Sequence, residues 1–329
     1  MPSATCSERP GGRLRRALLL IALALVARTA LLHPAHARAA CDHGLEYYGT
    51  YSVGTSAGVE TVPLATRLRE LSDLGANLVV ATGSGTDILR RLPTGMRAVP
   101  GCGLMKKKDW QHRGHWSEIE ARTHLAKLAA KFAHDRRVFG ICLTQEVTQY
   151  ASHTRRVWMY RLAKEYFPDQ KVIQHYGVLY DRENPAHHRV YAYGRYADLE
   201  TDVLFVSLPA VRHGRFNLRT AHRLDEALAA AARTPGVPVW GYTSINADSR
   251  SVTGPESMVD VWGARGENMK VWAARLLDTV HTDAAGQRLR LTGFFWRSLG
   301  RFPYDLGYPA FAPQRAEMRA IGGALCPGS

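Results

Sequence analysis

The feature that most constrains this chain is a regular alternation of short apolar segments with longer amphipathic ones. The apolar segments have the length of strands, and most are separated by segments with helical spacing. Short apolar strands between amphipathic helices are typical of a parallel sheet whose faces are both covered. The expected strands are 45–53, 77–81, 96–100, 138–143, 171–179, 202–208, 238–245 and 289–296.

The expected helices fall between or after these strands. They are 62–74, 116–132, 155–167, 187–199, 218–233, 269–281 and 316–321, with Ser117 as the N-cap of the second. Eight strands interleaved with helices in about 290 residues is the number that closes a (β/α)8 barrel. We therefore predict an α/β fold, a single (β/α)8 TIM barrel over residues 41–329. An open doubly wound sheet is the alternative, but no G-x-G-x-x-G follows the first strand.

The N-terminal segment has the order of a secretory signal peptide. Arg13, Arg15 and Arg16 precede an apolar run over 17–27, and a small-residue stretch, Ala-His-Ala, ends at Ala37. We expect residues 1–37 to be removed and the protein to be secreted. The apolar run is too short to span a membrane, and Arg38 stands where a lipoprotein needs an aliphatic residue, so we expect no stable membrane anchor.

The remaining chain is basic. Residues 1–37 hold five of the 43 Lys and Arg and one of the 29 Asp and Glu, so their removal leaves a formal net charge of +10. This charge favours a polyanionic partner such as an acidic glycan or a cell-wall polymer, although an Arg-rich composition alone also accounts for it. The basic residues are scattered apart from 106–108, and no nucleic-acid-binding motif is present, so we expect no nucleic-acid partner.

Four cysteines follow the predicted signal peptide, and they allow three disulfide pairings. Cys41 and Cys326 flank the first and last elements, so we expect them to join the two ends of the chain. Cys102 is the third, and Cys142 lies within an expected strand, where we expect a small buried residue. No metal-ligand spacing is present, and no His pair has H-x-H spacing on a strand. We expect neither a metal nor a cofactor, and a metal-dependent hydrolase ranks last.

The catalytic candidates are selected by one rule, that a barrel of this kind places its site where strands end. Glu146 closes an apolar run, and strand alternation places it on the side of Cys142 and Gly140. A carboxyl at the rim of a crowded interior loses water, which raises its pKa and suits it to general acid catalysis. The alternative is a strand-end carboxylate paired with an arginine.

The segment 139–147, Phe-Gly-Ile-Cys-Leu-Thr-Gln-Glu-Val, resembles the fourth strand of (β/α)8 glycoside hydrolases. In their large retaining clan that strand ends in Asn-Glu, so the resemblance implies Glu146 as acid/base and Gln145 as the amide that holds a sugar hydroxyl. The eighth strand, Gly-Phe-Phe-Trp at 293–296, resembles the strand that carries a sugar-stacking Trp, here Trp296.

One departure from the family concerns the second carboxylate. The retaining clan carries its nucleophile Glu at the end of strand seven, but residues 239–246 hold no acidic residue. Asp181 and Asp248 are equal candidates, and their separation from Glu146 would decide between retention and inversion. Hydrolysis assisted by the substrate itself stays open as well, and so does a barrel that binds sugar without cleaving it.

Other polar and aromatic residues at expected strand ends are candidates for substrate contact. Aromatic rings stack on the apolar faces of sugars, although packing in the core explains many such residues equally well. The candidates beside Gln145 and Trp296 are His175, Tyr176 and Tyr242, together with Trp110 in the long polar loop after the third expected strand. The sequence thus predicts a secreted glycoside hydrolase acting on a poly- or oligosaccharide, with a non-catalytic carbohydrate-binding barrel as the alternative.

Overall fold

Eight parallel strands form the central sheet of the computed structural model. In chain order they are β1 (Tyr47–Val53), β2 (Leu78–Thr82), β3 (Arg97–Cys102), β4 (Gly140–Thr144), β5 (Lys171–Tyr176), β8 (Val203–Ser207), β11 (Val239–Ser244) and β14 (Leu291–Arg297). Their order in the sheet is β3-β2-β1-β14-β11-β8-β5-β4, and each neighbouring pair is parallel. The strands are thus arranged cyclically in chain order, because β14 returns to lie beside β1.

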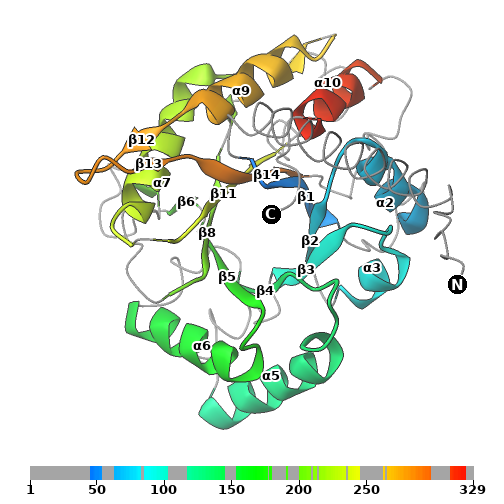
Figure 1. Ribbon diagram of the computed structural model, residues 1–329, viewed down its shortest axis with the longest axis vertical. Coiled ribbons are helices and arrows are strands. Elements are labelled where there is room, and N and C mark those ends of the chain that lie inside the picture. Colours follow the sequence, from blue (N-terminus) through cyan, green and yellow to red (C-terminus); the bar gives the residue numbers. More distant parts are fainter. Residues whose placement is uncertain are drawn as a thin grey trace, which may run out of the picture. The chain divides into compact units, whose positions relative to one another are not determined.

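The two ends of this order, β3 and β4, also meet. Ala98 of β3 forms a parallel bridge with Val138, just before β4. The Ala98 amide donates to the Arg137 carbonyl (2.8 Å), and the Phe139 amide donates to the Ala98 carbonyl (2.9 Å). The sheet therefore closes into a ring of eight strands (Figure 1), which confirms the predicted (β/α)8 barrel and excludes the open sheet.

The structure describes residues 45–53, 63–82, 85–102, 117–144, 153–176, 178–179, 190–191, 200–208, 210–212, 215–234, 236–244, 262–263, 265–297 and 312–323. All of them belong to one compact unit, His43–Leu325. The expected signal peptide, Cys41 and Cys326 lie outside the described residues.

Helices surround the ring of strands (Figure 1). They are α2 (Leu64–Asp73), α3 (Thr86–Arg91), α5 (Glu118–Phe132), α6 (His153–Tyr166), α7 (His222–Ala231) after the 3-10 helix η3 (Leu218–Ala221), α9 (Glu267–Asp278) and α10 (Ala312–Gly322). Ser117 caps α5 as predicted, since its hydroxyl accepts from the Glu120 amide (3.3 Å) and the Glu120 carboxylate accepts from the Ser117 amide (2.8 Å). None of the helices in the described residues has the length and apolar character needed to cross a bilayer.

Two hydrophobic clusters distinguish the inside of the barrel from its outside. The interior cluster draws on all eight strands and on no helix, so it fills the ring. Its members are Tyr51, Leu78, Val80, Val99, Cys102, Phe139, Cys142, Ile173, Val203, Phe205, Trp240, Tyr242 and Phe295. The outer cluster combines the alternate strand residues, such as Val79, Leu204 and Trp296, with the apolar faces of the helices. Gly293 makes room in the ring, because a Cβ there would lie 2.5 Å from the Trp240 indole.

Three short antiparallel pairs stand apart from the barrel: β6 (Val178–Leu179) with β7 (Val190–Tyr191), β9 (Val211–Arg212) with β10 (Arg215–Phe216), and β12 (His281–Thr282) with β13 (Arg288–Leu289). The first pair corrects two expectations. The expected strand 171–179 ends at Tyr176 in the barrel, and its last residues turn to pair with β7. The expected helix 187–199 is wrong at Val190–Tyr191, which form a strand; its other residues lie outside the described part.

Candidate active site

A polar aromatic group lies inside the barrel toward the carboxyl ends of the strands, where barrel enzymes carry their sites. His175 of β5 lies with its ring centre 5.0 Å from that of Tyr242 on β11 and 5.7 Å from that of Tyr51 on β1. The rings of Tyr51 and Tyr242 are 4.6 Å apart, and Phe205 of β8 packs against all three. The structure thus brings together three side chains that the sequence placed on expected strands, Tyr51, His175 and Tyr242. We call Tyr51, His175 and Tyr242 the inner group.

The strand ladders are irregular at this same end of the barrel. The register of β1 with β2 shifts between Tyr51 and Val53, that of β2 with β3 between Val80 and Thr82, and that of β4 with β5 between Cys142 and Thr144. Bulges are enriched at barrel rims and beside active sites, because they re-aim side chains. The shift in β4 also interrupts, two residues before Glu146, the regular alternation on which its inward direction was predicted.

Tyr176 does not belong to the inner group, although it follows His175 directly. Its side chain is fully buried in the outer cluster, and its hydroxyl donates to the Glu200 carboxylate (2.6 Å). Successive strand side chains point to opposite faces, so an inward His175 requires an outward Tyr176. The predicted contact of Tyr176 with a substrate in the barrel is therefore wrong.

Trp296 lies on the outer face as well. It is fully buried, its ring is perpendicular to that of Trp262 at 5.6 Å, and its indole N–H donates to the Tyr48 hydroxyl (2.9 Å). Burial raises the pKa of Tyr48 far above its usual range, which marks a dry layer between strands and helices. A ring that faces the helices and not the interior of the barrel cannot stack on a sugar at the barrel mouth, so the role that the family resemblance implied for Trp296 is wrong.

Sequence analysis missed a buried ion pair beside the end of β5. Glu200 is fully buried, and its two carboxylate oxygens accept from Nε and Nη2 of Arg156 on α6, each at 2.8 Å. Tyr176 donates to the same carboxylate, and the side-chain amide Nε2 of Gln174 donates to the Glu200 backbone carbonyl. The signal available in the sequence was the polar run Glu-Thr-Asp directly before a buried strand.

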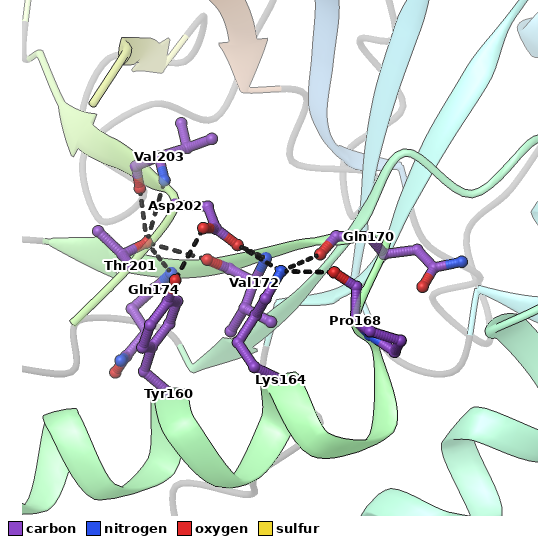
Figure 2. Close-up of polar contacts among 9 residues, drawn as sticks. All are labelled: Tyr160, Lys164, Pro168, Gln170, Val172, Gln174, Thr201, Asp202 and Val203. Carbon is purple, nitrogen blue, oxygen red and sulfur yellow. Dashed lines mark hydrogen bonds and ion pairs between the residues drawn. The ribbon is translucent and has the colours of Figure 1, made fainter. Parts of the chain in front are cut away.

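The next two residues of that run continue along the outer side of β5 toward its amino end (Figure 2). The Thr201 hydroxyl accepts from the backbone amide of Gln174 (3.1 Å), and the Asp202 carboxylate accepts from the backbone amide of Val172 (2.8 Å). Asp202 also accepts from Tyr160 (2.8 Å) and Lys164 (3.3 Å) of α6. These polar contacts fix α6, β5 and β8 to one another and thereby hold His175 in position.

A disulfide joins Cys102, the last residue of β3, to Cys142 of β4, with their Cα atoms 4.4 Å apart. The expectation that Cys142 is only a small buried residue is therefore wrong in part: it is buried, but it is also cross-linked. The pairing is compatible with the expected Cys41–Cys326 bond, which falls outside the described residues.

The predicted catalytic residues Glu146, Asp181 and Asp248 lie outside the described residues, as do Gln145 and Trp110, so all five stay predictions. β4 ends at Thr144, two positions before Glu146, and β11 ends at Ser244, four positions before Asp248. In the described part of the chain, no three His, Cys, Asp or Glu side chains are grouped as a metal site would need.

Comparison with models of known protein families and with curated proteins gives no match. Among solved structures, the catalytic domain of Thermobifida fusca endoglucanase Cel5A is 12% identical, with a TM-score of 0.48 over 85% of this chain and 93% of that domain. The β-D-glucuronidase of Dictyoglomus thermophilum is 12% identical with a TM-score of 0.49, and the β-glucuronidase of Bacteroides uniformis is 12% identical with a TM-score of 0.48. This chain spans 43% and 30% of those two proteins, so the likeness concerns the barrel alone.

Proposed function

We propose that this protein is an exported glycoside hydrolase that acts on a poly- or oligosaccharide, with Glu146 as the general acid/base. The inner group carries the proposal: a histidine and two tyrosines, each at most 3% exposed, meet inside a closed barrel toward the end where barrel enzymes bind substrate. Aromatic rings with polar tips can contact the faces of a sugar and its hydroxyls together.

The strand β4 leads into Gln145 and Glu146, which supply the amide and carboxyl that the family chemistry needs. In this role Glu146 protonates the leaving oxygen, and Asp181 or Asp248 acts as nucleophile or as the base for water. The disulfide between Cys102 and Cys142 supports export, since such bonds persist in oxidising compartments.

The deciding experiment is turnover by Glu146→Gln on a panel of neutral and acidic polysaccharides. We expect the wild type to release reducing ends from at least one polymer and the variant to lose at least about a thousandfold in kcat with its circular dichroism unchanged. Glu165→Gln on the surface of α6 is the matched control, because Glu165 is half exposed and pairs only with a surface arginine among its described contacts. An unchanged rate for Glu146→Gln would remove Glu146 from the mechanism.

A second candidate function is carbohydrate binding without turnover. The absence of a carboxylate from Val239–Ser244 of β11, where the retaining clan has its nucleophile, favours it. Single Asp181→Asn and Asp248→Asn variants separate the two functions. Loss of turnover in one of them identifies the second carboxylate, and the anomer of the product then distinguishes retention from inversion. Saturable binding by a wild type that releases no product from any polymer would favour the binding barrel.

A further inference from the structure

In the described part of the barrel, the junction between β3 and β4, which we call the seam, has fewer paired residues than any other junction between neighbouring strands. Among the described residues, its ladder pairing is the single bridge Ala98↔Val138 at the amino ends of the strands. At this amino end, the Arg97 guanidinium makes a cation–π contact with Phe139, with its Cζ 4.7 Å from the ring centre. On their other sides the two strands are paired along their length, β3 with β2 and β4 with β5.

The Cys102–Cys142 disulfide crosses this seam at its carboxyl half. Cys102 pairs in register with Thr82 of β2, and Cys142 pairs with Ile173 of β5, so each cysteine is held by a different neighbour. Both cysteines are buried and belong to the interior cluster. The covalent bond therefore lies where ladder hydrogen bonds would otherwise close the ring.

We propose that the Cys102–Cys142 disulfide closes the barrel at its carboxyl end and makes the position of β4 dependent on redox state. Reduction by a dithiol breaks the S–S bond with two electrons and two protons, leaves thiols at Cys102 and Cys142, and oxidises the dithiol to a disulfide. The amino-end bridge and the other seven strand pairs remain, so the seam opens locally while the sheet persists. For activity the inference rests on the proposed function: the two cysteines are positioning residues for β4 and the Gln145–Glu146 segment that follows it.

Amide hydrogen exchange on the full chain tests the seam without any assumption about substrate. We compare the oxidised protein, the protein reduced with dithiothreitol, and the Cys102→Ser/Cys142→Ser variant. Peptides that cover β3 and β4 should exchange at least about tenfold faster in both thiol forms, and peptides that cover β11 and β14 should not change. Should the serine pair not fold, Cys102→Ala/Cys142→Val refills the buried volume.

Two controls assign the effect to this bond. Dithiothreitol should change nothing further in the Cys102→Ser/Cys142→Ser variant, and it should still open the seam in Cys41→Ser/Cys326→Ser. Unchanged exchange in β3 and β4, or an equal rise in every strand, would overturn the proposal, because the disulfide would then have no specific effect on the junction between β3 and β4.

Kinetics on a polymer that the wild type cleaves tests the positioning role. The Cys102→Ser/Cys142→Ser variant should lose at least about tenfold in kcat with KM little changed, because the defect lies in alignment and not in binding. A local rise in exchange with an unchanged kcat would overturn the positioning role alone. Failure of the glycosidase proposal would show as no product from the oxidised wild type, which leaves the exchange result intact.

Discussion

At the scale of single residues, two tyrosines in the carboxyl halves of barrel strands have opposite environments. Tyr242 faces His175 inside the ring, whereas Tyr176 donates to buried Glu200 outside it. We expect Tyr242→Phe to weaken carbohydrate binding about 5–10-fold, because its ring faces the interior of the barrel. Tyr176→Phe should leave binding unchanged but cost about 1–3 kcal/mol, because Glu200 loses a donor. Binding isotherms and urea unfolding of both variants measure the difference, and the reverse pattern would contradict the assignment of inside and outside.

The buried pair of Arg156 and Glu200 leads to a second prediction at this scale. Their side chains are 5% and 0% exposed, so Glu200→Gln leaves an arginine charge in the core without its counterion. We expect a loss of about 3–5 kcal/mol in the free energy of unfolding, measured by urea titration. Glu165→Gln is the matched control: its pair with Arg122 is 53% and 40% exposed, and solvent screens it. Equal losses in the two variants would show that burial does not set the strength of the pair.

At the scale of elements, the sequence predicted where the strands lie but not which way their side chains face. The strands of a covered parallel sheet are apolar on both faces, so the pattern that marks β5 or β14 as a strand does not reveal its interior side. A shift of one residue reverses the assignment, and this is why Tyr176 and Trp296, expected inside the barrel, lie on its outer face. Glu200 escaped notice for a different reason, because its partners Arg156 and Tyr176 are 44 and 24 residues away in the chain.

The cap of α5 shows the opposite case, a feature that local sequence predicts well. Ser117 and Glu120 are three residues apart and satisfy each other's backbone amides. We expect Ser117→Ala to lower the free energy of unfolding by about 1 kcal/mol, because an amide of the first turn loses its acceptor. Ser117→Asp should retain most of the stability, since Asp caps as well as Ser. Urea unfolding with an unchanged m-value checks both, and a loss in Ser117→Asp as large as in Ser117→Ala would contradict the capping explanation.

At the scale of the whole molecule, the closed ring follows from the count and spacing of its strands, but its means of closure does not. Eight strands predict a barrel. The local sequence around Ala98 and Val138 does not predict that their bridge is the only ladder pair between β3 and β4 in the described residues. The cross-link depends on a contact across 40 residues, which spacing cannot select from three possible pairings. Contacts between residues far apart in the chain are thus the part that the sequence does not predict, both for the Cys102–Cys142 disulfide and for the buried pair of Arg156 and Glu200.

The net charge gives a last prediction at this scale. With residues 1–37 removed, the chain carries +10 spread over its length, so its attraction to an anionic polymer should be long-range and screened by salt. We expect the Kd for polygalacturonate to rise at least about tenfold between 50 and 500 mM NaCl, and the Kd for a neutral β-glucan to stay constant. Titration calorimetry at the two salt concentrations measures both. Charge alone attracts any polyanion, so salt-sensitive binding does not by itself identify the substrate. Cleavage of polygalacturonate, with a KM that rises with salt in parallel with the Kd, would identify an acidic substrate. Salt-sensitive binding without cleavage, beside cleavage of the neutral polymer, would instead show that the charge reflects an Arg-rich composition and not the choice of substrate.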